Sequence, residues 1–309
     1  MAISPNDVSL RQLQYAVALA DALGFHKAAV RCHVSQPTLS AQVKQLEDVL
    51  GVRLFERDRR RVFLTAAGER VVAHARRVLL DVGDLLAAAE QFAEPGAGTL
   101  RIGVIPTVAP YILPSLVPAA RSRFPKLRLV FREERTDSIV ADLRDGSLDA
   151  GLLALEAEIG EWSRGEITKD AFVVALPSGH PLTRKKRISP ADLEGENVLL
   201  LDEGHCFRTQ ALAVCSRTGA KEGEYRATSL ATLAQMVSSG SGITLLPAMA
   251  VPVENRAGQL EVRPFTAPSP HRTIALVWRP QSPFADTLGA LASSFQSSAR
   301  RRGPSRPGS

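Results

Sequence analysis

The sequence predicts an N-terminal all-α winged helix-turn-helix domain, a long linker helix and a C-terminal α/β domain with two lobes. Apolar residues recur at helical spacing over residues 10–50, and an arginine-rich segment and a heptad repeat follow. From residue 100 onward, short strand-like runs alternate with helical ones. The predicted boundaries are residues 1–65, 66–94 and 95–298, with a basic, disordered tail over 299–309.

Length and composition limit the possible classes of protein. A chain of 309 residues is too long for one ordinary core, and 45% hydrophobic with 23% charged residues argues against general disorder. The N-terminus has no basic start followed by an apolar segment, and no run approaches about 18 apolar residues, so we expect a cytoplasmic protein without a membrane partner. The net charge of +6 is weak support for nucleic-acid binding, because arginines in the tail supply four of these charges.

Two short helices and a third, longer one are predicted in the first fifty residues. Leu10, Leu13, Val17, Ala20 and Leu23 share one helical face, and Gly24 is expected to end that helix. A short helix follows over 25–30. Ser35 is a natural N-cap for the third helix, which has Pro37 in its first turn and ends at Gly51.

The third helix has the polar surface of a helix that enters a DNA groove. Its buried side carries Val43, Leu46 and Leu50, which leaves small polar and basic side chains outside. Gln can read adenine edges, Ser and Thr can contact phosphates or bases, and the leading N–H groups bind phosphate. The predicted DNA-binding residues, including two from the following segment, are Ser35, Gln36, Pro37, Thr38, Ser40, Lys44, Arg53 and Arg57.

The segment after Gly51 is predicted to form a β-hairpin wing. Five arginines stand between positions 53 and 61, and alternation continues through Val62 and Leu64. A small-residue helix pair alone is typical of packing, and an arginine run alone is typical of a solvated surface. Their combination predicts a winged helix-turn-helix that binds double-stranded DNA.

A heptad repeat follows Thr65, which can cap the next helix. A seam over three heptads cannot bury itself in a monomer, so the helix is predicted to dimerise; the alternative is packing on its own domain. The seam consists of Val71, Ala75, Val78, Val82, Leu85, Ala89 and Phe92.

The pattern after the linker at 94–99 predicts mostly parallel sheets in two lobes around a cleft, with chain crossings near 167 and 265. Strand-like runs cover 100–105, 127–131, 150–153, 172–176, 198–201, 243–246 and 274–278, and helical runs include 112–124, 138–145 and 230–239. Ligands in such folds bind at the carboxyl ends of strands and at helix starts. Thr107 and Thr136 occupy such places, although turn capping explains both equally well.

The segment from Leu199 to Cys215 contains the most reactive chemistry. A strand ends in a polar turn, and Cys206 is predicted at a helix start beside His205 and Arg208, all of which favour a thiolate. Peroxide would convert this thiolate to a sulfenic acid, which a second thiol resolves as a disulfide. If residues 206–215 are helical, the two cysteine Cα atoms lie roughly 13 Å apart, and a disulfide requires the helix to unravel.

Two other interpretations of these cysteines remain open: inert core residues, and a metal site with His205. Zinc is less favoured because only three soft ligands lie nearby in the sequence. Cys32 is predicted to be a buried packing residue.

The N-terminal domain resembles the LysR-type regulators along its whole length. The matching segments are Ala28-Ala29, Val34–Ser40, Leu46-Glu47, Leu50-Gly51, Leu54–Arg57 and Leu64–Gly68. The resemblance implies a dimerising linker helix, a pseudo-palindromic promoter site, a regulatory domain with the periplasmic-binding-protein-like fold, and RNA polymerase as a partner. A regulator that senses a small metabolite in the cleft is the main alternative within this family, and a thiol peroxidase is the alternative among enzymes.

The regulatory half resembles the peroxide-sensing members of that family, which activate antioxidant genes and assemble as dimers of dimers. The resemblance rests on Ile105–Tyr111, Gly204–Ala211 with Cys215, Ala227–Leu230 and Gly240–Pro247. It implies that Cys206 is the peroxidatic and Cys215 the resolving cysteine, without cofactor, metal or enzymatic turnover. It further implies that Thr107 and Thr136 hold hydrogen peroxide while His205, Arg208 and Arg272 tune the thiolate. One departure is Thr209, where an acidic residue is usual, which bears on the oxidation rate.

Overall fold

The computed structural model describes residues 4–301 except 59–60, 95, 158 and 216–218. The chain divides into two compact units, Met1–Ala89 and Glu90–Ser309. Residues 302–309, most of the predicted basic tail, lie outside the described part, as do Arg59 and Arg60 of the predicted wing.

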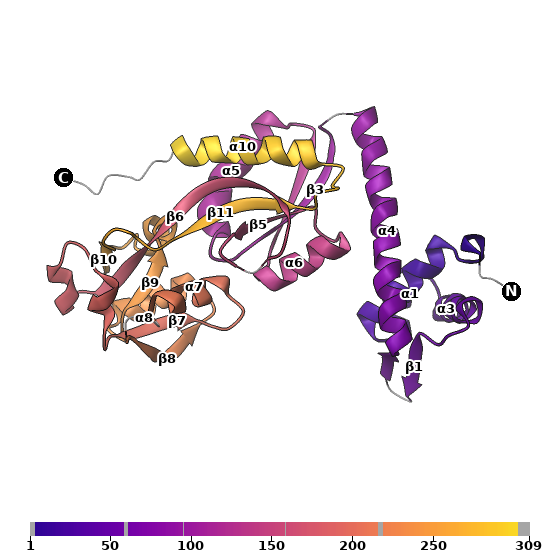
Figure 1. The fold of residues 1–309 in the computed structure, drawn as a ribbon, viewed down its shortest axis with the longest axis horizontal. Helices are drawn as coiled ribbons and strands as arrows, with labels where there is room; N and C mark the ends of the chain where they lie inside the picture. The colour runs from indigo at the N-terminus through magenta and orange to yellow at the C-terminus, as the bar shows by residue number, and fades with distance from the viewer. Residues whose placement is uncertain (1–3, 59–60, 95, 158, 216–218, 302–309) are drawn as a thin grey trace. The chain divides into compact units, whose positions relative to one another are not determined.

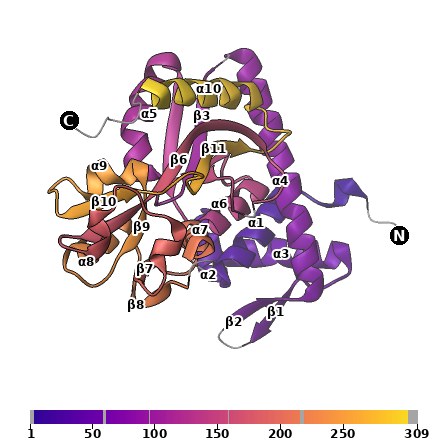
Figure 2. The same cartoon turned by 60° about the vertical axis from the view of Figure 1, so that its left-hand side comes forward.

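The first unit packs three helices against a hairpin and the start of a long helix (Figure 1). In order, its elements are η1 (Pro5–Asp7), α1 (Leu10–Ala22), α2 (Phe25–Arg31), α3 (Gln36–Leu50), β1 (Phe55–Asp58), β2 (Arg61–Leu64) and α4 (Ala66–Ala93). Leu19, Leu39, Leu46 and Leu54 are fully buried in its core. The hairpin of β1 and β2 extends away from the helices (Figure 2).

Local capping explains where these helices begin and end. Ser35 caps α3 by accepting the N–H of Thr38 at 3.2 Å, and Gly51 ends it in the left-handed conformation. The predicted stop at Gly24 is wrong by one residue: Leu23 is the left-handed C-cap of α1, while Gly24 is the N-cap of α2. The reason is that the connection between α1 and α2 is short, so the residue with the left-handed backbone is Leu23, one position before the glycine.

The side chains of Glu47 and Thr65 connect the wing to the helices by hydrogen bonds. Glu47 of α3 accepts the N–H groups of Leu54 and Phe55 at 2.7 and 3.1 Å. Thr65 donates to the carbonyl of Arg53 at 2.7 Å and accepts the N–H of Gly68 at 2.9 Å, so it caps α4 as predicted. These bonds fix the hairpin relative to α3.

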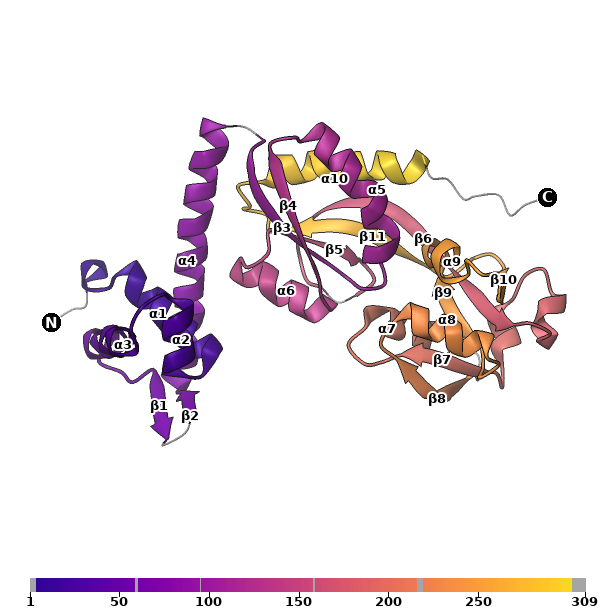
Figure 3. The same cartoon turned by 180° about the vertical axis from the view of Figure 1, so that it is seen from behind.

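The second unit has two lobes joined by the crossing strands β6 (Ser163–Pro177) and β11 (His271–Trp278) (Figure 3). The first lobe contains β3 (Gly98–Val104), α5 (Ala109–Arg123), β4 (Leu127–Glu133), α6 (Thr136–Asp145) and β5 (Ala150–Ala154). It also contains α10 (Ala285–Arg301), which lies with α5 along one side of the sheet while α6 lies on the other (Figure 1).

The second lobe surrounds a separate apolar core. Its elements are η2 (Pro181–Arg184), η3 (Pro190–Leu193), β7 (Asn197–Leu201), α7 (Cys206–Cys215), β8 (Lys221–Ala227), α8 (Leu230–Ser238), β9 (Thr244–Pro247), η4 (Ala248–Ala250), α9 (Val251–Glu254) and β10 (Leu260–Pro264). The second half of β6 pairs with β9 and β10, while its first half pairs with β11. One strand therefore belongs to both lobes.

The expectation of mostly parallel sheets is wrong. β3–β4, β3–β5 and β7–β8 are parallel, whereas β6 and β11 run antiparallel to their strand neighbours. The reason is that both strands carry the chain from one lobe to the other, against the direction of the strands they join. Also, α10 continues to Arg301, so the helix extends into the first residues of the predicted tail.

Candidate functional site

Helix α7 begins at Cys206 and ends at Cys215, and both are free cysteines. Cys206 is half-buried in the first turn, while Cys215 is buried in the core of the second lobe. Because the segment is one continuous helix, its rise places the two Cα atoms about 13 Å apart. Burial raises the pKa of Cys215 to about 11, so this thiol stays protonated at neutral pH.

A narrow pocket brings Cys206 together with residues of the first lobe. The strand end after β3 and the start of α6 supply one wall, and the turn between β7 and α7 supplies the other. The lining residues are Ile105, Pro106, Thr107, Arg135, Thr136, Gly204, His205 and Cys206. Seven residues were predicted around the redox centre. Four of them line this pocket: Thr107, Thr136, His205 and Cys206.

The two threonines have different hydrogen-bonding states. The Thr107 hydroxyl accepts a bond from Arg272 Nη1 at 2.7 Å, and its carbonyl accepts Nη2 at 2.8 Å. Thr136 is 7% exposed, and its buried Oγ1 has no hydrogen-bond partner within the described part of the chain. A buried hydroxyl without a partner is costly, so this atom is available to a small ligand.

Arg272 is fully buried beneath the pocket, where it connects both crossing strands. Its Nε donates to Asp170 of β6 at 3.0 Å, and its guanidinium lies over the ring of Phe207 with Cζ 5.4 Å from the centroid. Burial raises the pKa of Asp170, although Arg272 and the backbone N–H groups of Met249 and Ala248 stabilise its carboxylate. Asp170 has no local sequence signal that pairs it with Arg272, since 102 residues separate the two.

The electrostatics of the pocket differ from the expectation for His205. Burial first, and the positive charge of Arg135 second, lower the pKa of His205, so its ring is neutral at pH 7. The cation that lines the pocket is instead Arg135, which precedes α6 and lies against Gly204: a Cβ at Gly204 would come within 2.7 Å of Nη1. Arg135 is not among the residues predicted from the sequence, and its position directly before Thr136 was the available signal.

Arg208 lies outside the pocket lining. Its guanidinium donates to the carbonyl of Leu201 at 3.1 Å and to Glu222 at 2.8 Å. These bonds attach α7 to β7 and β8, so Arg208 holds the helix in place. Thr209 is exposed on the same helix.

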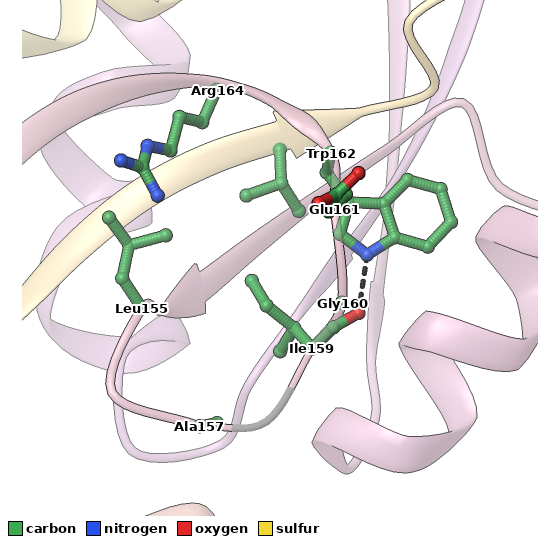
Figure 4. A pocket seen from close by; sticks show the side chains of 8 residues that line it. Leu155, Ala157, Ile159, Gly160, Glu161, Trp162 and Arg164 are labelled. Carbon is green, nitrogen blue, oxygen red and sulfur yellow. Dashed lines mark hydrogen bonds between the residues drawn. The ribbon is translucent and has the colours of Figure 1, made fainter.

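A second hollow, of about 330 Å³, lies in the first lobe at the loop that connects β5 to β6 (Figure 4). Leu155, Ile159 and Arg164 line it, and Trp162 Nε1 donates to the carbonyl of Ile159 at 2.6 Å. It contains neither cysteine nor histidine among its lining residues, so it is separate from the reactive thiol.

In the first unit, the predicted DNA contacts gather at the start of α3 and on the wing. Gln36, Pro37, Thr38, Lys44 and Arg53 are exposed. Ser35 is exposed as well, but its hydroxyl is engaged in the helix cap and with Thr38 Oγ1 at 2.7 Å, and Ser40 is half-buried. Arg57 lies in β1, and its side chain lies outside the described part.

Among the described residues, no cluster of three or more His, Cys, Asp or Glu side chains could hold a metal ion. Of the helices in the described part, none has the length and apolarity needed to cross a membrane.

Comparisons with known proteins agree with both units. Residues 10–69 match the model of the bacterial regulatory helix-turn-helix proteins of the lysR family, and residues 93–299 match the LysR substrate binding domain. The chain is 44% identical over 290 residues to the DNA-binding transcriptional dual regulator OxyR of Escherichia coli, covering 94% of this chain and 95% of the relative.

Two solved structures extend the similarity to the fold. A full-length OxyR of Pseudomonas aeruginosa with one cysteine replaced by aspartate has a TM-score of 0.76 at 38% identity, covering 98% of this chain and 99% of that one. A cysteine-to-serine variant of Corynebacterium glutamicum OxyR with hydrogen peroxide bound has a TM-score of 0.61 at 33% identity, covering 97% of both chains. This chain therefore belongs to the LysR family of bacterial helix-turn-helix regulators, alongside the OxyR proteins.

Proposed function

We propose that this chain is a transcription regulator that senses hydrogen peroxide through reversible disulfide formation between Cys206 and Cys215. The observation that supports this best is the narrow pocket where Cys206 meets Thr107 and the unpartnered hydroxyl of Thr136. Hydrogen peroxide has two O–H donors and two acceptor oxygens, so it can satisfy Thr136 while one oxygen faces the sulfur. Relatives that carry the name hydrogen peroxide-inducible genes activator, and the OxyR variant with hydrogen peroxide bound, support the same assignment.

The proposed chemistry has two balanced steps. The Cys206 thiolate attacks one peroxide oxygen; the O–O bond breaks, sulfenic acid forms, and the leaving hydroxide takes a proton to become water. The Cys215 thiol then displaces hydroxide from the sulfenic sulfur, which yields the disulfide and a second water. Arg135 and the first turn of α7 place positive charge near the reacting atoms.

Oxidation changes the conformation because the distance does not permit a bond in the helix. A disulfide requires Cα atoms about 4.4–6.8 Å apart, about half of their separation in α7 or less. We infer that α7 unravels, and that this loss of structure between the lobes is what the regulator transmits to DNA. The protein itself reacts stoichiometrically with the oxidant and is not an enzyme.

The DNA-binding unit is inferred to act as a dimer. The later part of the α4 seam is exposed, with Val78 at 42%, Leu85 at 67% and Phe92 at 90%. Such a row of apolar side chains fits a second copy of the helix, and two-fold pairing matches a pseudo-palindromic promoter site. We further infer a dimer of dimers that contacts RNA polymerase in the cytoplasm and activates antioxidant genes.

The deciding experiment combines peptide mapping without reductant after brief peroxide exposure with DNA footprinting of both forms. A Cys206–Cys215 peptide and an altered footprint are expected. Cys206→Ser should abolish both, whereas Cys32→Ser, the matched control in the other unit, should leave both unchanged.

If Cys206→Ser leaves induction intact, the chain responds to a metabolite instead of peroxide. If the protein consumes many equivalents of peroxide per thiol with reductant present, it is a thiol peroxidase.

A further inference from the structure

The residue directly after Cys206 is the structural link between the reactive helix and the buried ion pair. Phe207 is 2% exposed and lies in the first turn of α7. One face of its ring is covered by the guanidinium of Arg272, 5.4 Å from the centroid. Phe172 of β6 meets it edge-on, with the two centroids 5.2 Å apart and the planes at 85°.

Phe207 covers a part of Arg272 that its hydrogen bonds do not reach. In the plane of the guanidinium, Nε donates to Asp170, and Nη1 and Nη2 donate to Thr107. The ring of Phe207 adds an aromatic neighbour to these hydrogen bonds, with the guanidinium carbon over its face. Because Arg272 is 0% exposed, water does not compete with this contact.

This contact reaches the reactive pocket in two steps. Phe207 fixes the plane of Arg272, and Arg272 fixes the hydroxyl and carbonyl of Thr107, which lines the pocket with Cys206. Phe207 does not itself line the pocket, so it acts through Arg272.

The contact exists only while α7 is intact. Joining Cys206 to Cys215 requires the helix to open, and Phe207 lies next to Cys206 in its first turn. Its ring then leaves Arg272 and Phe172, and the free energy of both contacts is lost from the oxidised form alone.

We propose that Phe207 is a positioning residue that stabilises the dithiol form over the disulfide form, and so sets how readily the regulator is oxidised. This inference rests on the proposed function. Desolvated cation–π contacts contribute about 0.5–2 kcal/mol and aromatic pairs about 0.5–1.5 kcal/mol, so the loss of both, about 1–3.5 kcal/mol, corresponds to a change of about 5- to 400-fold in the equilibrium constant.

The test compares Phe207→Leu with Phe265→Leu in the full-length protein. Phe265 is also fully buried in the core of the second lobe, so both changes remove the same atoms from one core. Each variant is equilibrated in buffers of reduced and oxidised glutathione, where two glutathione thiols exchange with the protein disulfide. The fraction of disulfide is read from alkylation of the remaining thiols and mass spectrometry.

Phe207→Leu should shift the glutathione ratio at half-oxidation about 5- to 400-fold toward the reducing side, since its cost falls on the dithiol form. Phe265→Leu should lower the unfolding temperature without this shift, because its cost falls on both forms equally. Phe207→Met replaces the ring with an unbranched apolar side chain. It should behave like Phe207→Leu and provides a second variant if leucine impairs folding.

Equal half-oxidation ratios for the wild type and both Phe207 variants would overturn the inference and leave the proposed function intact. Failure of the wild-type protein to form the Cys206–Cys215 link would overturn both.

Discussion

Replacing Arg272 with methionine tests whether the buried ion pair between the crossing strands is an essential part of the regulatory unit. The change keeps an unbranched apolar stem but leaves the carboxylate of Asp170, which has only 2% of its side chain exposed, without its cation. Breaking a buried pair from one side costs about 3–5 kcal/mol. For a unit of this size, each kcal/mol lowers the unfolding temperature by about 2–4 °C, so the expected loss is about 6–20 °C.

The measurement is differential scanning calorimetry of the full-length protein, in which we expect a separate transition for each of the two compact units. The transition of the regulatory unit should fall, and that of the DNA-binding unit should stay unchanged. The double variant Arg272→Met with Asp170→Asn should recover at least half of the loss, because it removes the uncompensated charge. A single-variant loss below about 2 °C, or a double variant less stable than the single one, would refute this reasoning.

Three further predictions concern other parts of the molecule. Gly68→Ala should unfold the DNA-binding unit and abolish operator binding, because the new Cβ would lie 2.0 Å from the carbonyl oxygen of Leu54. Gly83→Ala is the control in the same helix, because a Cβ there meets nothing within 4 Å. It should raise the free energy of unfolding in urea by about 1 kcal/mol. Iodoacetamide at pH 8 should label Cys206 and spare Cys215 in the reduced protein, since a pKa of about 11 leaves about one thiolate in a thousand; equal labelling would contradict the buried position of Cys215. Arg135→Gln should slow the oxidation of Cys206 about 2- to 10-fold in stopped-flow measurements. High salt should reduce this difference between the variant and the wild type, because Arg135 is exposed. An unchanged oxidation rate at low salt would exclude Arg135 as the cation of the pocket.

The arrangement around Arg272 explains how a change in one short helix can reach the whole regulatory unit. Asp170 and Arg272 lie on the two strands that join the lobes, and Thr107 and Phe207 come from different lobes. Tyr111 of α5 also donates to Glu254 of α9 at 2.7 Å, which adds another bond between the lobes. Unravelling of α7 would therefore act directly on residues that connect the lobes.

The sequence by itself determined the features that depend on neighbours in the chain. Ser35, Gly51 and Thr65 act within a few residues of their own positions, so the helix limits they set were predictable from capping rules. The spacing of Cys206 and Cys215 likewise fixed their separation as soon as the segment was recognised as helical.

Only the tertiary structure decided which distant residues complete the pocket. Asp170 and Thr107 meet Arg272 across 102 and 165 residues, and no local pattern encodes such pairings. The first half of β6 and the strand β8 are mostly polar and partly exposed, so they carry little strand signal. These strands form because they hydrogen-bond to neighbouring strands. The lowered pKa of His205 likewise depends on the assembled unit, because desolvation acts only once both lobes enclose the ring.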